Sequence, residues 1–200
     1  MKRILLYGGA FNPPHLGHER ILKAALDFTK PDIALITPSP ISPHKEAAAV
    51  PWGARELMCR CFKSLDARIK ISGLERAGKH DKSYTLKTLR RIRKIYGGCE
   101  VFLLIGGDML LSFETWHRYR RILPLCTIVA ATRLGDDKAA LETMARRLEK
   151  QSSRVLLMDY EPLPMSSSEI RAAYKAGEDP SDKLTDCVAK FIEERGLYRT

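Results

Sequence analysis

Short apolar segments alternate with longer amphipathic segments along the whole of this chain. Apolar runs such as ILLY at residues 4–7 and TIVAA at 127–131 show no polar alternation, which is typical of strands buried on both faces of a sheet. The expected strands cover residues 2–7, 32–37, 68–73, 100–108, 126–132 and 154–159, and the expected helices cover 16–29, 52–65, 84–96, 137–150, 167–175 and 184–195. We therefore predict an α/β fold in which helices cover both faces of a parallel sheet.

The connections between these segments restrict the topology further. Because parallel strands are joined by right-handed crossovers, the expected arrangement is a Rossmann-like, doubly wound parallel sheet. The 200 residues contain no internal repeat and no linker-like stretch, so a single domain is expected. In such sheets ligands bind at the carboxyl ends of the strands, near the point where the strand order reverses.

Composition argues against a membrane protein. No apolar run approaches the roughly 18–20 residues that span a bilayer, and MKRILLYGG has too short an apolar stretch for a signal peptide. We therefore expect a cytoplasmic protein without a membrane partner. The net charge of +10 favours a polyanionic partner, either a nucleic acid or a small phosphorylated substrate, and does not choose between them.

The five cysteines, at positions 59, 61, 99, 126 and 187, form no pattern of metal ligands. Cys59 and Cys61 are two apart, but no second cysteine or histidine pair follows at the spacing of a zinc site. Because free cysteines are among the most buried side chains, we expect buried free thiols here.

The stretch GGAFNPPHLGH, residues 8–18, directly follows the first expected strand. Glycines at the end of a strand let the backbone approach a phosphate closely, and Pro13 and Pro14 make the chain turn before the helix starts. His15 and His18 are three apart at the helix entrance and therefore lie on one face. These residue types at this position predict a phosphate-binding loop.

Two imidazoles at a helix N-terminus can donate hydrogen bonds to phosphate oxygens, where the helix dipole already favours negative charge. A metal site would need the spacing HExxH, with histidines four apart and a general-base glutamate, and that spacing is absent here. The alternative that both histidines only cap and pack the helix fits the surrounding glycines and prolines less well. We therefore assign both histidines to phosphate binding and expect no metal ligands.

A second anion site is expected in the segment PMSSSEIR near the C-terminus. Ser166 followed by Glu169 forms a capping box and marks a helix start. Ser167 and Ser168 then share a face with Arg171, so that two hydroxyls and a guanidinium can bind one anion. The two helix starts, far apart in sequence, could grip one triphosphate from both sides.

With both segments in view, the chain resembles the (H/T)xGH nucleotidyltransferases and, within them, the bacterial nicotinate-nucleotide adenylyltransferases. Further matching stretches occur in the family's order, namely PHK at 43–45, SYT at 83–85 and IGGDMLLSFETWHRY at 105–119. Arg133 matches an arginine just after the fifth strand of the family. The resemblance covers essentially the whole chain, and its specificity comes from the combination of motifs.

The resemblance implies adenylyl transfer from ATP to nicotinate mononucleotide, which yields nicotinate adenine dinucleotide and pyrophosphate in NAD biosynthesis. It implies catalytic roles for His15, His18 and Arg171, with His18 on the α-phosphate and Arg171 on the leaving pyrophosphate. The residues expected to bind ATP are Gly8, Gly9, Ala10, Phe11, Lys45, Gly106, Asp108, Arg133, Ser167 and Ser168, with helices over about 166–196 completing the ATP site. Mg²⁺ is expected to arrive with ATP, because the sequence has no dedicated carboxylate cage.

The acceptor is expected to bind on Tyr84, Thr85, Trp116 and His117. The Trp116 ring offers a stacking face for the pyridine, and the helix start at Thr85 offers backbone N–H groups to the nicotinate carboxylate. The chain departs from the family pattern at His117, where tyrosine is common, and at Ala10, where serine or threonine is common. The first departure bears on the choice between nicotinate and nicotinamide, and the second leaves only backbone groups to contact phosphate.

Other interpretations stay open. Adenylyltransferases for nicotinamide mononucleotide or phosphopantetheine belong to the same superfamily, although the SYT and WH stretches argue against the second. A basic nucleic-acid-binding domain would need lysines and arginines interleaved with aromatic residues, and this pattern is absent. We therefore expect no nucleic-acid partner, whereas the sequence leaves formation of a homo-oligomer open.

Overall fold

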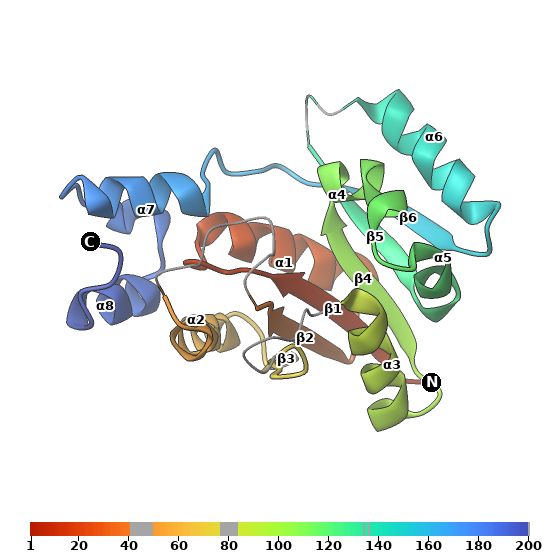
Figure 1. Ribbon diagram of the computed structural model, residues 1–200, viewed down its shortest axis with the longest axis horizontal. Helices are drawn as coiled ribbons and strands as arrows, with labels where there is room; N and C mark the ends of the chain where they lie inside the picture. Colours follow the sequence, from red (N-terminus) through yellow and green to blue (C-terminus); the bar gives the residue numbers. More distant parts are fainter. Residues whose placement is uncertain (41–49, 77–83, 134, 136, 200) are drawn as a thin grey trace.

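The computed structural model describes residues 1–40, 50–76, 84–133, 135 and 137–199, and in them six strands form one sheet (Figure 1). The strands are β1 (Arg3–Gly9), β2 (Ile33–Pro38), β3 (Ile69–Ile71), β4 (Glu100–Gly106), β5 (Thr127–Thr132) and β6 (Arg154–Asp159). Every neighbouring pair is parallel, and the spatial order is β3-β2-β1-β4-β5-β6. This confirms the predicted Rossmann-like, doubly wound fold.

The strand order reverses between β1 and β4, which places the topological switch point there. Tyr7 of β1 pairs with Leu104 of β4, so the carboxyl ends of these two strands lie side by side. The segment GGAFNPPHLGH begins at the end of β1, and the segment with Gly106 and Asp108 begins at the end of β4. Two of the stretches singled out in the sequence therefore meet where such sheets bind their ligands.

Helices cover both faces of the sheet. They are α1 (Leu16–Thr29), α2 (Trp52–Cys59), α3 (Thr85–Tyr96), α4 (Gly107–Leu111), α5 (Tyr119–Ile122), α6 (Lys138–Glu149), α7 (Ser167–Lys175) and α8 (Asp186–Glu194). Short 3-10 helices are η1 (Arg60–Ser64), η2 (Phe113–Thr115), η3 (Leu123–Leu125) and η4 (Ser181–Lys183). Among the described residues, no helix combines the length and the apolar character that a membrane crossing requires.

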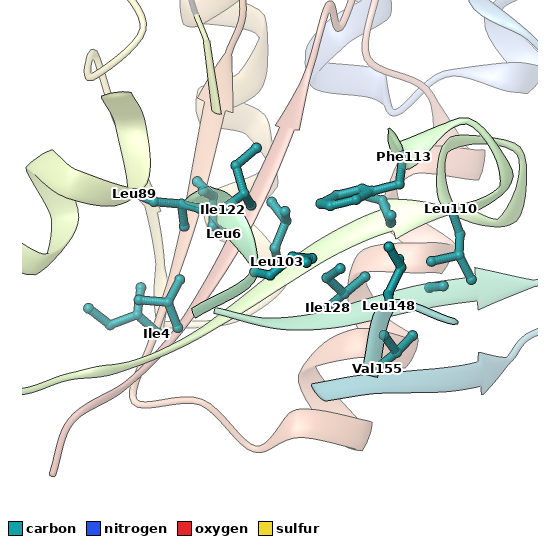
Figure 2. Close-up of a cluster of buried hydrophobic side chains, with 14 of the residues drawn as sticks. Ile4, Leu6, Leu89, Leu103, Leu110, Phe113, Ile122, Ile128, Leu148 and Val155 are labelled. Atoms are coloured by element: carbon teal, nitrogen blue, oxygen red, sulfur yellow. The ribbon is translucent and has the colours of Figure 1, made fainter. Parts of the chain in front are cut away.

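The strands are apolar on both sides because each side has its own core. Ile4 and Leu6 of β1 belong to a cluster that packs under α3, α4, α5 and α6, part of which Figure 2 shows. Leu5 and Tyr7 point to the opposite side and pack with α1, including Leu22. Successive residues of β1 thus alternate between two buried faces, which explains the uninterrupted apolar run.

The last part of the chain, residues 166–199, lies beside the sheet as part of the same domain, and we call it the C-terminal lobe. Its helices α7 and α8 lie together at one end of the molecule, beyond α1 and α2 (Figure 1). An apolar cluster joins the lobe to Val50, Met58 and Cys61 around α2 and η1, and its members in the lobe are Ile170, Tyr174, Leu184, Val188, Ile192 and Tyr198. The lobe therefore packs on the helix beside the β1 loop rather than on the sheet.

Most predicted elements agree with the structure, and the following boundaries differ in addition to shifts of one or two residues elsewhere. The helix expected over 52–65 becomes 3-10 after Cys59, and the strand expected over 68–73 is limited to Ile69–Ile71. The last helix starts at Asp186 because the Thr185 side chain caps it. The strand expected over 100–108 ends at Gly106, which is the N-cap of α4, so Asp108 lies in a first helical turn, where the dipole favours its charge.

The prediction that all five cysteines are buried free thiols is wrong for two of them. Cys61 and Cys187 form a disulfide across a sequence separation of 126 residues, and Cys187 is exposed. Cys59 and Cys99 are buried free thiols, and Cys126 is a free thiol that is only partly buried. The pairing arises because the C-terminal lobe packs against η1, and nothing in the cysteine spacing indicates that contact.

Candidate active site

The loop after β1 is shaped by an aromatic ring that lies beneath it. Phe11 has a positive φ of 46°, and its side chain is almost completely buried. A Cβ on Gly9 would lie 3.1 Å from the Cζ atom of Phe11, so the ring occupies space that only glycine leaves. The Phe11 ring also meets the His18 imidazole edge to face, with 5.1 Å between centroids. Phe11 is thus a support for the loop and for a predicted catalytic histidine.

The two histidines stand together at the start of α1, as the sequence predicts. Their ring centroids are 3.8 Å apart, and His15 is the N-cap of the helix. The backbone N–H of His15 donates to Nδ1 of His18 at 3.2 Å. Because Nδ1 accepts, a neutral His18 carries its proton on Nε2. That proton is the one available to an anion at the helix start.

Burial keeps both imidazoles uncharged near neutral pH. Desolvation lowers the pKa of His15 from 6.5 to about 4, with Glu169 acting weakly in the opposite sense. Desolvation, with a contribution from His15, lowers the pKa of His18 well below 6.5. Both side chains are therefore neutral near pH 7, with one ring N–H each, and are not cations.

We expect the stability of the protein to fall in mild acid because of this pair. Between a pKa of 6.5 for an unfolded histidine and about 4 for folded His15, the unfolded chain binds more protons. The free energy of unfolding therefore decreases as the pH drops from 6.5 towards 4. Thermal unfolding midpoints across this range should fall more steeply for the wild type than for His15→Asn. Equal slopes would show that His15 is not buried as a neutral group.

A buried arginine supports the same loop from α2. Arg55 is only 2% exposed, and its Nη1 donates to the carbonyl oxygens of Ala10 and, at 2.8 Å, Ser39. Burial lowers the pKa of this guanidinium. Ser39 in turn donates its N–H to the carbonyl of Gly9 at 2.8 Å. Nothing in the sequence marks Arg55 as a site residue, because a single arginine on a helix normally faces solvent.

The C-terminal lobe closes on the loop at Asn12 and Pro13. Arg171 donates from Nη1 to the Asn12 carbonyl at 2.8 Å, and Ser167 donates from Oγ to the Pro13 carbonyl at 2.9 Å. The Tyr198 hydroxyl donates to Oδ1 of Asn12 at 2.7 Å. The two stretches that the sequence analysis singled out are therefore in direct contact, although 159 residues separate Asn12 from Arg171.

The start of α7 has the predicted form. Ser166 and Glu169 make the expected capping box, which satisfies two backbone N–H groups. Arg171 donates from Nη2 to Oγ of Ser168 at 3.1 Å, so these two predicted ligands lie together. The Ser167 hydroxyl, by contrast, is engaged by the carbonyl of Pro13. Tyr198 was missed because it lies outside every motif of the sequence, whereas Asn12 lies inside GGAFNPPHLGH but its side chain was given no role there.

The end of β4 brings Gly106 and Asp108 together. A Cβ on Gly106 would lie 2.6 Å from Oδ1 of Asp108, so the carboxylate folds back over the glycine. Arg133 is exposed and directly follows β5, the next strand in the sheet. Lys45, the remaining predicted ATP ligand, lies outside the described residues.

The predicted acceptor residues come from two elements that meet beyond the end of β4. The Tyr84 and His117 rings are stacked, with centroids 4.2 Å apart, and Tyr84 occupies the N-cap position of α3, directly before Thr85. Trp116 is partly buried and packs on Phe113, with 4.9 Å between centroids. The structure thus brings the start of α3 and the segment after η2 to one place.

A cavity of about 520 Å³ lies along another side of α1. It is lined by Leu16, Glu19, Arg20, Lys23, Ala24, Asp159, Tyr160, Glu161 and Leu163. Glu19 is buried, and desolvation raises its pKa. None of the site residues predicted from the sequence lines this cavity.

Comparison of the sequence with known proteins gives one consistent family. The profile of the cytidylyltransferase-like family matches residues 6–173. A protein of Albidiferax ferrireducens is 34% identical over 202 residues, covering 100% of both chains. A protein of Shouchella clausii is 35% identical over 199 residues, covering 99% of this chain and 97% of the other. Both are named as probable nicotinate-nucleotide adenylyltransferases.

Solved structures share the architecture. The nicotinic acid mononucleotide adenylyltransferase of Plasmodium falciparum complexed with NaAD superposes with a TM-score of 0.79 at 17% identity, covering 99% of this chain and 98% of that one. The same enzyme complexed with APC gives a TM-score of 0.76 with the same coverage. At this level of identity the likeness establishes the fold.

Proposed function

Because the chain belongs to the cytidylyltransferase-like family, and to the nicotinate-nucleotide adenylyltransferases within it, we propose that it transfers the adenylyl group of ATP to nicotinate mononucleotide. An acceptor phosphate oxygen attacks the α-phosphorus, the bond to the bridging oxygen breaks, and pyrophosphate leaves. The products are nicotinate adenine dinucleotide and pyrophosphate, a step of NAD biosynthesis. The observation that carries the proposal is the contact of Arg171 with Asn12, because it joins two anion-binding helix starts.

The acceptor phosphate is already an anion, so the reaction needs no general base. Catalysis then consists of positioning and of stabilising the charge that develops on the phosphoryl oxygens. The Nε2–H of neutral His18, fixed by the hydrogen bond at Nδ1, is the donor for the α-phosphate. His15 binds the neighbouring phosphate, and the backbone of Gly8 to Phe11 completes the cradle.

The C-terminal lobe binds the leaving pyrophosphate, which is an anion. The guanidinium of Arg171 and the hydroxyl of Ser168 lie 3.1 Å apart at the start of α7, where the helix dipole also favours an anion. Ser167 fixes this helix to the loop through Pro13 and offers its backbone N–H. A charged fork next to a helix N-terminus suits the β- and γ-phosphates.

The remaining ATP contacts follow the family pattern. Gly106 and Asp108 are assigned to the ribose, Lys45 to the phosphates, and Arg133 to the nucleotide. In the described part of the chain, no three His, Cys, Asp or Glu side chains are grouped as metal ligands. We propose that Mg²⁺ enters as MgATP, since this ion commonly binds through substrate phosphates. The cytoplasmic location and a homo-oligomer stay predictions.

Nicotinate mononucleotide is assigned to the site formed by α3 and the segment after η2. The pyridine stacks on Trp116, beside the stacked pair of Tyr84 and His117. The carboxylate accepts from backbone N–H groups at Thr85, at the positive end of α3. The first turn of α3 carries no acidic residue, which supports binding of an anion there.

Release of pyrophosphate from MgATP with three separate acceptors tests this assignment. We expect rapid turnover with nicotinate mononucleotide and much slower turnover with nicotinamide mononucleotide, because the amide lacks the charge that the α3 N-terminus stabilises. Phosphopantetheine should give no product. Equal rates with the acid and the amide would reject the acceptor assignment. Absence of pyrophosphate with all three would reject the enzyme class.

A further inference from the structure

The disulfide lies where the C-terminal lobe meets the support of the β1 loop. Cys61 belongs to η1, which directly continues α2, and Cys187 is in the first turn of α8. On one side of the bond, α2 carries Arg55, which holds the carbonyl of Ala10. On the other side, the lobe carries Arg171, which holds the carbonyl of Asn12. The bond therefore joins two elements, α2 with η1 and the C-terminal lobe, that both form hydrogen bonds with the loop after β1.

Among the described residues, the lobe is also held by an apolar cluster and by side-chain hydrogen bonds. It follows β6 in the chain and packs on α2 and η1 through one apolar cluster, which includes Ile170 and Val188. Its polar contacts with the β1 loop come from Ser167, Arg171 and Tyr198. A covalent connection between such elements limits how far the lobe can move from the loop.

The two bonded cysteine residues differ in their exposure to solvent. Cys187 is exposed, whereas Cys61 is only 8% exposed. A thiolate from solution can therefore attack Sγ of Cys187, which releases Cys61 as the leaving thiolate. Cys59 and Cys126 are poor partners for exchange, because burial raises the pKa of Cys59 and raises that of Cys126 to about 12. Cys99 is buried and belongs to the core on the other side of the sheet.

We propose that Cys61 and Cys187 form a reversible thiol–disulfide site whose oxidation state sets the affinity of the enzyme for ATP. Two thiols of a reductant supply two electrons and two protons. The protein disulfide becomes two thiols, and the reductant becomes a disulfide. The first thiolate forms a mixed disulfide at Cys187, and the second resolves it. A small-molecule disulfide such as oxidised glutathione reverses the reaction.

The expected effect is confined to one substrate. This inference rests on the proposed function, because it uses the assignment of Ser168 and Arg171 to the ATP phosphates. Reduction frees the lobe that carries these groups and so weakens MgATP binding. The acceptor residues, by contrast, belong to α3 and the segment after η2, outside the cluster that anchors the lobe. The KM for nicotinate mononucleotide should therefore stay unchanged.

The test compares the whole protein after treatment with oxidised glutathione and after treatment with dithiothreitol. Alkylation followed by mass spectrometry should find Cys61 and Cys187 bonded in the first form and free in the second. MgATP affinity, measured by calorimetry and as KM, should be roughly fivefold or more weaker in the reduced form, the lower end of measured couplings between sites. Reoxidation should restore it.

Two variants test whether the effect depends on the bond between Cys61 and Cys187. The double variant C61A/C187A should bind MgATP like the reduced wild type and should not respond to either reagent. The matched control Cys126→Ser, which changes a free thiol in a different core, should respond like the wild type. If the double variant does not fold, Cys187→Ser and the treated wild type give the same comparison.

Equal MgATP affinity in the two redox forms would overturn the proposal, as would finding both cysteines free after oxidised glutathione. An equal change in the KM of both substrates would also overturn it, because it would indicate general loosening of the fold. Calorimetry detects ATP binding without turnover. A failure of the proposed reaction, seen as absent pyrophosphate in both forms, is therefore distinguishable from a failure of this inference.

Discussion

Replacement of His18 by alanine is expected to lower kcat by roughly 10²–10³-fold, the usual loss for one preorganised donor at a developing charge. The imidazole is held from two sides, by the N–H of His15 at Nδ1 and by the ring of Phe11. Its Nε2–H is therefore aimed before the substrate arrives. The measurement is pyrophosphate release under saturating MgATP and nicotinate mononucleotide.

A structural role for His18 has to be separated from this catalytic one. His18→Ala also removes the acceptor for the His15 N–H, so its thermal midpoint should fall somewhat. His18→Gln keeps a side-chain donor and should recover part of the lost rate. A well-folded His18→Ala protein with kcat within about threefold of the wild type would show that His18 only shapes the helix start.

Replacement of Arg171 by alanine is expected to lower kcat/KM for ATP by roughly 10–150-fold, the range for a hydrogen bond to a charged group. Its guanidinium contacts Asn12 and Ser168 and thus lies between the β1 loop and the start of α7. The loss should appear with ATP as the varied substrate, while the KM for nicotinate mononucleotide stays near the wild-type value.

Two further variants show whether the loss in Arg171→Ala comes from a specific contact or from the general positive charge of the lobe. Arg171→Lys keeps the charge but not the planar fork, so its activity should be intermediate. Lys175→Ala removes an exposed positive charge at the end of the same helix and should leave kcat/KM unchanged. If Arg171→Ala and Lys175→Ala behaved alike, the general positive field of the lobe, and not a specific contact, would account for ATP binding.

The sequence predicts the sheet and the start of α7 for identifiable physical reasons. Strands that are buried on both faces appear as continuous apolar runs, and β1, β4 and β5 all have this form. The start of α7 is predictable because Ser166 and Glu169 satisfy each other's backbone groups within four residues. Features of this kind depend on neighbours in the chain.

The features that sequence reasoning missed depend on contacts between distant segments. Arg55 is buried because the carbonyls of Ala10 and Ser39 converge on it, and its own helix gives no sign of this. Tyr198 reaches Asn12 across 186 residues. The pairing of Cys61 with Cys187 likewise follows from how the lobe packs. Local patterns therefore indicate the groups that we propose to bind anions but not the framework that holds them.

The proposed mechanism requires that the two helix starts bind one triphosphate. This requirement is tested most directly by measuring kcat/KM for ATP in the wild type, the two single variants and the double variant H18A/R171A. Residues that act on one ligand, or in one network, couple by about 0.5–3 kcal/mol. We expect the loss in the double variant to be smaller than the product of the two single losses. A loss equal to that product would show that His18 and Arg171 act independently and would contradict a shared triphosphate site.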